Sequence, residues 1–231
     1  ETAVGLYPDA IAFDGVNMWV TNRNSNSVSV LRASDCTHVM TPTVGSLPFR
    51  IAFDGANMWV VNNGSANVSV LRASDGAHVM TPTVGTGPCG IAFDGVNMWV
   101  ANCADGNVSV LRASDGTHVM TLTVGSTPIA IAFDGANMWV TDMDSDYVSV
   151  FRASDGTLVK TINVGDKPSA IAFDGANMWV VNELDDTVSI IRAADFALVD
   201  TIPVGDRPLG IAFDGAYMWI TNGDDNTVSK R

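Results

Sequence analysis

Amide and carboxylate side chains recur at a fixed spacing along this chain. Six of them end the motif WVTN or a close variant of it, once in each of six similar segments: Asn22, Asn62, Asn102, Asp142, Asn182 and Asn222. Such side chains can hydrogen-bond to neighbouring backbone and close a turn. Their oxygen atoms are also ligands that Ca²⁺ prefers. Because Asp142 is the only acidic member, a calcium site would use Asp142 with Asn182 and Asn222 as its neighbours.

Further carboxylates gather in the short segments that follow these positions in the second half of the chain. They are Asp144, Asp146, Glu183, Asp185, Asp186, Asp224 and Asp225. The first half instead offers the cations Arg23 and Arg50 in its variable segments. The acidic residues either serve solubility or bind a cationic ligand. The candidate binding residues are these seven carboxylates together with Arg50, Asn22, Asn62 and Asn102.

Catalytic constellations are not found in the variable segments. They contain no histidine, and no Ser, Cys or Lys of the chain is flanked by a recognisable base, which weighs against triad or His-dependent lyase chemistry. Cys89 and Cys103 fall on adjacent predicted strands and therefore near each other. They form a cross-strand disulfide, remain two thiols, or contribute to a metal site; a disulfide would indicate export.

The elements that position these residues follow from a sixfold repeat. The motif IAFDG begins at residues 11, 51, 91, 131, 171 and 211. In the second unit the apolar runs 51–53 and 58–60 and the alternating runs 67–71 and 78–84 predict four short antiparallel strands, A to D. The Asp-Gly after the first run favours a type I′ hairpin turn, and SDG marks a second turn. No helical periodicity is present.

Four strands in every unit, with the unit repeated six times, predict an all-β, six-bladed β-propeller with four antiparallel strands per blade. One Trp and one Phe per unit would fill the space between blades. We expect one domain, residues 1–231, with blades at about 8–45, 48–85, 88–125, 128–165, 168–205 and 208–231. Residues 1–5 resemble the end of a D strand, so we expect them to complete the last blade.

Sequence divergence between the units is confined to two loop sets. The A–B turn reads FDG in all six units, whereas the B–C and D–A loops differ in every unit. Because strand direction alternates, the B–C and D–A loops share one face of each blade. Loops on a rigid frame often carry binding function, so this face is the predicted binding surface.

Charge and length exclude several classes of protein. The formal net charge of −13 in 231 residues repels phosphate and anionic lipid, so neither nucleic acid binding nor membrane insertion is expected. No apolar run approaches the roughly 18 residues of a membrane span.

The repeated WVTN strand end, the VSV strand and the TVG segment before each A strand resemble the YVTN family of β-propeller repeats, which is related in layout to NHL repeats. Proteins that resemble this family include surface and interaction proteins, so the resemblance implies a binding role. Similar propellers also include a streptogramin lyase and calcium-dependent lactonases, which would imply an enzyme.

We therefore expect a secreted or cell-envelope protein of bacterial or archaeal origin. We expect it to bind a protein, a peptide or a small molecule, which would be cationic if it complements the acidic loops. We expect no catalysis and no required cofactor. The alternative is a calcium-dependent hydrolase or lyase with its site at the mouth of the axial channel.

Overall fold

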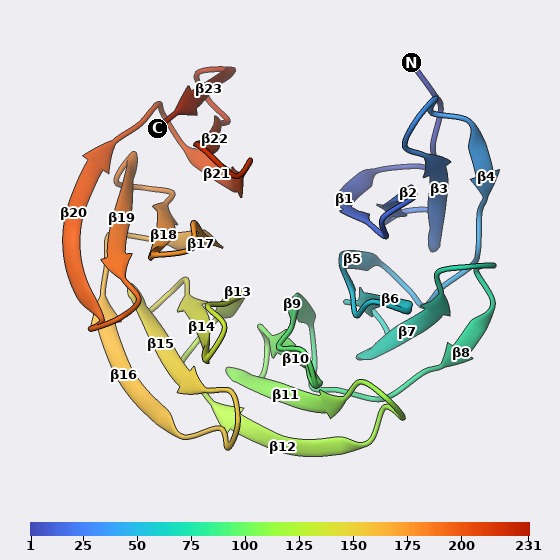
Figure 1. Ribbon diagram of the computed structural model, residues 1–231, viewed down its shortest axis with the longest axis horizontal. Coiled ribbons are helices and arrows are strands. Elements are labelled where there is room, and N and C mark those ends of the chain that lie inside the picture. The colour runs from blue at the N-terminus through green and yellow to red at the C-terminus, as the bar shows by residue number, and fades with distance from the viewer. The chain divides into compact units, whose positions relative to one another are not determined.

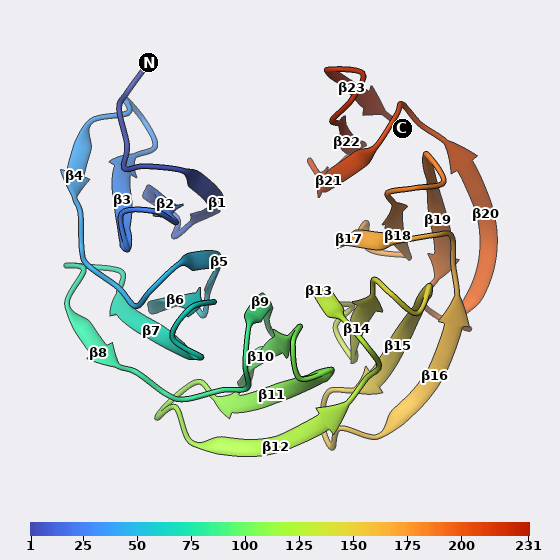
Figure 2. The ribbon, with the colours of Figure 1, turned by 180° about the vertical axis from the view of Figure 1, so that it is seen from behind.

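The computed structural model describes all residues from 1 to 231, and every regular element in it is a β-strand. The strands form six antiparallel sheets, one per sequence repeat, and within each sheet they follow chain order. Figures 1 and 2 show this order from the two sides. The prediction of an all-β chain with six propeller blades is confirmed. The chain has no helix that could span a membrane.

The chain divides into two compact units, residues 1–121 and 122–231. The first unit holds three blades. Blade 1 contains β1 (Pro8–Phe13), β2 (Asn17–Asn22), β3 (Ser27–Arg32) and β4 (His38–Met40). Blade 2 contains β5 (Pro48–Phe53), β6 (Asn57–Asn62), β7 (Asn67–Arg72) and β8 (His78–Met80). Blade 3 contains β9 (Pro88–Phe93), β10 (Asn97–Asn102), β11 (Asn107–Arg112) and β12 (His118–Thr123), and the boundary between the units falls within β12.

The second unit holds the other three blades. Blade 4 contains β13 (Pro128–Phe133), β14 (Asn137–Asp142), β15 (Tyr147–Arg152) and β16 (Leu158–Asn163). Blade 5 contains β17 (Pro168–Phe173), β18 (Asn177–Asn182), β19 (Thr187–Arg192) and β20 (Ala197–Pro203). Blade 6 contains β21 (Pro208–Phe213), β22 (Met218–Asn222) and β23 (Thr227–Lys230).

The sixth blade differs from the expectation, because its sheet has three strands and residues 1–5 form no strand. The expectation that residues 1–5 complete this blade stays a prediction, because residues 1–5 and blade 6 belong to different units. Residues 1–5 bond to blade 1: Thr2 Oγ1 donates to the Cys36 carbonyl at 3.2 Å, and Gly5 N–H donates to Ser29 Oγ at 3.3 Å. Gly45 makes the same bond to Ser69 in blade 2 at 3.2 Å, so residues 1–5 occupy the place of an incoming D–A segment.

The tryptophans link successive blades within each unit. Trp19 packs with Met58 and Val60 of blade 2, and Trp139 packs with Met178 and Val180 of blade 5. Trp19, Trp59, Trp99 and Trp139 are fully buried. Burial of such a large apolar side chain stabilises these contacts between blades. Trp219 is 39% exposed, and the phenylalanines Phe13 and Phe213 are exposed rather than buried.

The A–B turns are held by a carboxylate instead of forming the expected type I′ turn. Only the glycine has a positive φ, as in Gly55 at 98°, and Asp54 does not. Asp54 Oδ1 accepts hydrogen bonds from the backbone N–H groups of Ala56 and Asn57, and its Oδ2 accepts one from Trp59 Nε1 at 2.6 Å. The Asp of FDG therefore closes the turn and also satisfies the buried indole.

Each A strand is irregular near its start. In blade 2, Pro48 lies opposite Asn62 and Ile51 lies opposite Val60, so the pairing skips a residue at Phe49 and Arg50. Blade 1 has the same irregularity between Pro8 and Ile11. Such bulges change the direction of side chains, and here they fall where the A strand leaves the D–A loop.

Candidate binding surface

The B–C and D–A loops of each blade lie together, as expected. In every blade the first residue of the B–C loop donates its backbone N–H to the carbonyl of a D–A loop residue. Examples are Arg23 to Tyr7 at 2.9 Å and Gly223 to Arg207 at 2.8 Å. The divergent segments therefore form one hydrogen-bonded rim in each blade, and this rim is the candidate binding surface.

Side chains of the B–C loops also hold the D–A loops in place. Asp185 Oδ2 accepts the N–H of Asp166 at 2.8 Å within blade 5, and Asp186 Oδ1 accepts the N–H of Arg207 in blade 6, also at 2.8 Å. Asp146 accepts the N–H of Lys167 in the next blade, and Asp225 accepts the N–H of Asp206 in its own blade. In the first unit Ser25 Oγ accepts the N–H of Leu6 within blade 1, as Asp185 does for Asp166 in blade 5. Part of the acidic character of blades 4 to 6 is therefore structural.

The remaining carboxylates of these loops face cations of the next blade or solvent. Asp144 forms an ion pair with Lys167, and Glu183 pairs with Arg207 at 3.0 Å. Asp224 lies 3.6 Å from Arg207 and is 63% exposed. In the loops of blades 4 to 6, nine carboxylates surround only two cations. Three of those carboxylates, on Asp225, Asp186 and Asp224, raise the pKa of Asp206, which indicates an uncompensated negative potential.

The residues that end strand B are buried beneath this rim. Asn22, Asn62, Asn102, Asp142 and Asn182 have no exposed surface, and Asn222 is 3% exposed. Asn62 Nδ2 donates to Asn67 Oδ1 at 2.8 Å and to Ser69 Oγ at 2.9 Å. The five asparagines repeat this arrangement within their own blades, and their Oδ1 atoms are buried without a hydrogen-bond partner.

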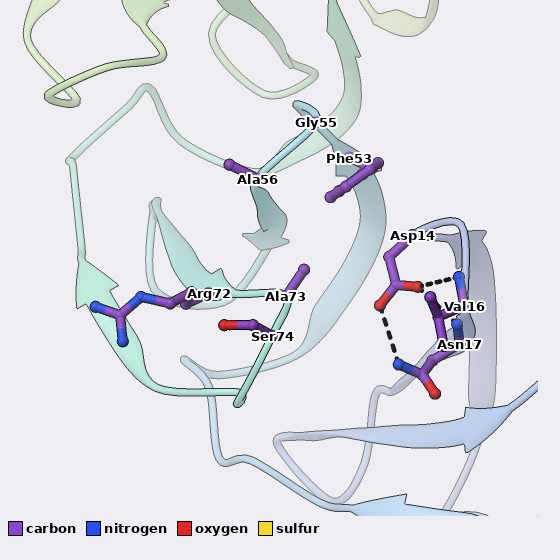
Figure 3. A pocket seen from close by; sticks show the side chains of 9 residues that line it. All are labelled: Asp14, Val16, Asn17, Phe53, Gly55, Ala56, Arg72, Ala73 and Ser74. Carbon is purple, nitrogen blue, oxygen red and sulfur yellow. Dashed lines mark hydrogen bonds between the residues drawn. The ribbon is translucent and has the colours of Figure 1, made fainter.

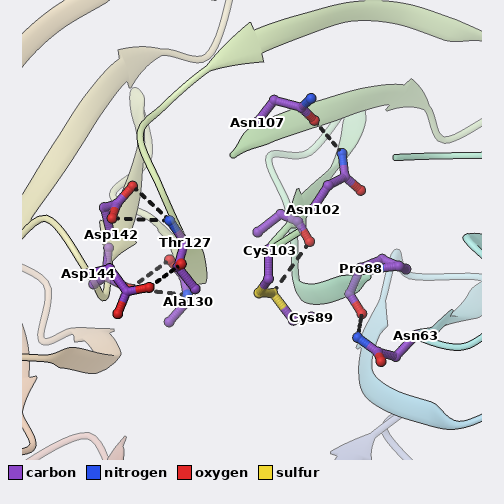
Figure 4. The surroundings of a disulfide bond; sticks show 12 residues. Asn63, Pro88, Cys89, Asn102, Cys103, Asn107, Thr127, Ala130, Asp142 and Asp144 are labelled. Carbon is purple, nitrogen blue, oxygen red and sulfur yellow. Dashed lines mark hydrogen bonds between the residues drawn. A yellow bond between two sulfur atoms is a disulfide. The ribbon is translucent and has the colours of Figure 1, made fainter. Parts of the chain in front are cut away.

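Asp142 has a different environment from the asparagines. Its two oxygens accept the N–H of Thr127 at 3.2 and 3.3 Å (Figure 4). Asn182 and Asn222 instead bond to Ser189 and Ser229 in blades 5 and 6. The structure therefore engages each proposed calcium ligand separately. The chain contains no group of three or more His, Cys, Asp or Glu side chains placed to hold a metal ion.

A disulfide joins Cys89 to Cys103, and their Cα atoms are 6.1 Å apart (Figure 4). Cys89 lies at the bulge of β9, and Cys103 follows the end of β10. The bond therefore ties the first strand of blade 3 to its B–C loop, beside the hydrogen bond from Cys103 N–H to the Gly87 carbonyl at 3.1 Å. Cys36 is a free, exposed thiol.

The matching positions in blade 1 hold an ion pair in place of a disulfide. Arg23 Nη1 lies 3.7 Å from Asp9 Oδ2. Arg50, from the first strand of blade 2, donates to Asp9 Oδ1 at 3.4 Å. Both guanidinium groups lie over the ring of Phe49, at 5.3 Å for Arg23 and 4.5 Å for Arg50. Arg50 was a predicted binding residue and Arg23 a second cation of the variable segments, whereas Asp9 and Phe49 were not predicted.

A hollow of about 550 Å³ lies on the opposite face between blades 1 and 2 (Figure 3). Its lining residues are Asp14, Val16, Asn17, Phe53, Gly55, Ala56, Arg72, Ala73 and Ser74. Asp14 is engaged by the turn that it closes, and Arg72 pairs with Asp75 at 2.9 Å. The same residue types recur at these positions in the other blades, so the hollow has no residue that distinguishes it as a specific binding or catalytic site.

Comparison with known proteins supports the fold and nothing more specific. No family model matches the sequence, and no curated protein matches it. The solved structures that resemble the chain include three of different kinds. Hydrazine synthase from Kuenenia stuttgartiensis has a TM-score of 0.66 at 18% identity, covering 100% of this chain and 97% of that chain. A functionally unknown protein from Desulfotomaculum acetoxidans has a TM-score of 0.80 at 15% identity, covering 93% and 78%.

The third is the computationally designed Ika8 protein, with a TM-score of 0.83 at 14% identity, covering 96% of this chain and 70% of that one. At these identities the likeness establishes the fold alone. The resemblance to the YVTN family stays a prediction, and function must be argued from the site.

Proposed function

We propose that this protein is a non-catalytic binding scaffold, and that its B–C and D–A loops contact the partner. The observation that carries the proposal is the rim itself. The same backbone hydrogen bonds hold the loops in all six blades, while the outward side chains differ from blade to blade. A rigid frame with varied side chains reduces the entropy lost on binding.

Charge supports one class of partner for blades 4 to 6. The excess of carboxylates in their loops and the raised pKa of Asp206 favour a cationic protein or peptide. The alternative of a calcium-dependent hydrolase or lyase would need Asp142, Asn182 and Asn222 to converge on one ion, and each has its own partners within its blade. No observation favours that alternative over binding.

The proposal includes a secreted or cell-envelope location. A disulfide between Cys89 and Cys103 persists in oxidising compartments and is rare in the cytosol. This bond supports export of the protein.

The test compares charge removal on the two faces of the second unit. The double variant Asp144→Asn/Asp224→Asn removes two rim carboxylates whose side chains are 45% and 63% exposed. The control Asp155→Asn/Asp195→Asn removes two C–D turn carboxylates of similar exposure, 47% and 52%. Both variants change the net charge equally.

The binding of an octalysine peptide is measured by calorimetry at two ionic strengths. The rim variant should bind about threefold to tenfold more weakly than the wild type, and the control should bind like the wild type. Equal weakening in both variants, or no saturable binding by the wild type, would contradict a partner surface at the rim.

A further inference from the structure

The near-identity of the repeats makes each departure from them informative. The position of Arg50 holds Ala or Gly in the other five blades, as at Ala10 and Gly90. The position of Arg23 holds Asn63 in blade 2 and Met143 in blade 4. Because those blades form the same strands without an arginine, neither arginine is required for the blade to fold.

Four residues from the variable segments meet at one place between blades 1 and 2. Asp9 and Arg23 come from blade 1, and Phe49 and Arg50 come from the bulged start of β5. They are separated by up to 41 residues in sequence, yet Asp9 lies within 3.4 Å of Arg50 and 3.7 Å of Arg23. Charged residues distant in sequence that converge in space point to a shared function.

Internal pairing leaves the two guanidinium groups with unused binding capacity. The one hydrogen bond between them and Asp9 is long, at 3.4 Å, and Arg23 makes none to Asp9. Each guanidinium carries five N–H donors. The side chains of Arg23 and Arg50 remain 34% and 43% exposed, whereas Asp9 is 14% exposed. The donors can therefore be reached from solvent, and the carboxylate is largely covered.

The cluster carries a net positive charge in a chain whose net charge is −13. Two arginines share one carboxylate, so one positive charge is left over. Burial raises the pKa of Asp9 despite the two guanidinium groups, and burial lowers the pKa of Arg50 despite Asp9. The surroundings are thus partly dehydrated, which strengthens a charge-assisted hydrogen bond to an incoming anion.

We propose that Arg23 and Arg50 bind the carboxylate group of an organic acid that carries an apolar side group. This proposal rests on the proposed role of the loop face in binding. A single carboxylate balances the one excess charge, and the planar guanidinium groups match its geometry. Phe49, whose ring lies beneath both guanidinium groups, supplies the apolar surface for that side group.

The probe is N-acetylphenylalanine, with N-acetylphenylalanine amide as its neutral match and inorganic phosphate as a second anion. Calorimetry measures binding to the wild type, to Arg50→Ala and to Arg23→Asn. Both variants introduce residues that other blades already hold at these positions, so they should fold. Arg72→Ala, on the opposite face and 53% exposed, is the matched control for loss of one positive charge.

We expect saturable binding of the acid but not of the amide. Arg50→Ala and Arg23→Asn should each weaken it by about tenfold or more, and Arg72→Ala should leave it unchanged. Asp9→Asn separates a binding role from a structural one. It removes the internal competitor and should strengthen binding by about threefold to tenfold, whereas a site that merely holds the blades together would lose both stability and binding.

Equal binding of acid and amide would overturn the proposal, as would an unchanged affinity in Arg50→Ala. Tighter binding of phosphate than of the acid would overturn the assignment to a carboxylate. The octalysine experiment tests other residues, in the second unit. If the acid does not bind at Arg23 and Arg50, the proposed function of the acidic rim is unaffected. If octalysine does not bind, the binding of the acid can still be measured and interpreted.

Discussion

A methyl group at Gly45 is a sharp test of how the D–A segments pack on the strand B asparagines. An added Cβ would lie 2.6 Å from both Cγ and Nδ2 of Asn62 and 2.9 Å from its Cβ. Asn62 has no exposed surface, and Asn67 and Ser69 hold its amide. Because Gly45 does not have a positive φ, the reason for glycine is this close approach and not backbone freedom.

The size of the effect follows from these contacts. Non-bonded carbon atoms pack at about 3.5–4.0 Å, so Asn62 or the Gly45 backbone must move by about 1 Å in Gly45→Ala. Overpacking costs about 1–3 kcal/mol, and losing a hydrogen bond of Asn62 adds about 1 kcal/mol. We expect Gly45→Ala to lower the free energy of unfolding by about 2–4 kcal/mol.

Urea denaturation followed by tryptophan fluorescence measures this loss. Asn62→Ala removes Cγ and Nδ2 but keeps the Cβ at 2.9 Å, so in that background Gly45→Ala should cost about half as much, roughly 1–2 kcal/mol. Gly210→Ala is the control, because Ala10, Ala130 and Ala170 occupy that position in other blades; it should change stability by less than about 0.5 kcal/mol. Additive costs in the double variant, or a wild-type midpoint for Gly45→Ala, would refute the packing argument.

Three further predictions concern stability. Cys89→Ser/Cys103→Ser should lose about 3 kcal/mol, the value for a loop of about 15 residues, and thermal melting with and without a reductant should then coincide for this variant but not for the wild type. Burial raises the pKa of Asp174, but hydrogen bonds such as that from Trp179 outweigh burial, so the net effect is a lowered pKa. The ionised carboxylate therefore stabilises the fold above the unfolded pKa, and this stabilisation is lost on acidification below about pH 4. In an acid titration of stability, Asp174→Asn should lose less stability than the wild type. Arg152→Ala removes an exposed ion pair and should leave the urea midpoint unchanged, and a clear shift would show that this pair matters more than its exposure suggests.

Repetition made much of the fold predictable. The spacing of IAFDG, the apolar runs and the turn residues predicted four strands per repeat, and the structure has them in five blades. The turn type was wrong, because the Asp of FDG accepts hydrogen bonds from its own turn and from the following Trp, as with Asp54 and Trp59. Its side chain thereby closes the turn without a second positive φ. The sheet of blade 6 has three strands, and the completion of this blade by residues 1–5 stays a prediction, because the two segments lie in different units.

The candidate site was predictable only in part. Loop divergence located the rim, and hydrogen bonding by the strand B asparagines was one of the two interpretations considered. Arg50 was selected as a candidate, but its partner Asp9 belongs to the preceding repeat and is distant in sequence. The bulge that places Phe49 and Arg50 beside blade 1 is a property of strand pairing, and no local pattern in the sequence reveals it.

The sequence by itself determined the repeat, the strand order and the face on which the blades diverge, because these depend on local periodicity and turn chemistry that recur in every unit. Only the tertiary structure decided which carboxylates hold the backbone and which remain free, and which charged residues of different blades meet. Those outcomes depend on distances between blades. Residues far apart in sequence approach one another only when buried tryptophans bring successive blades into contact.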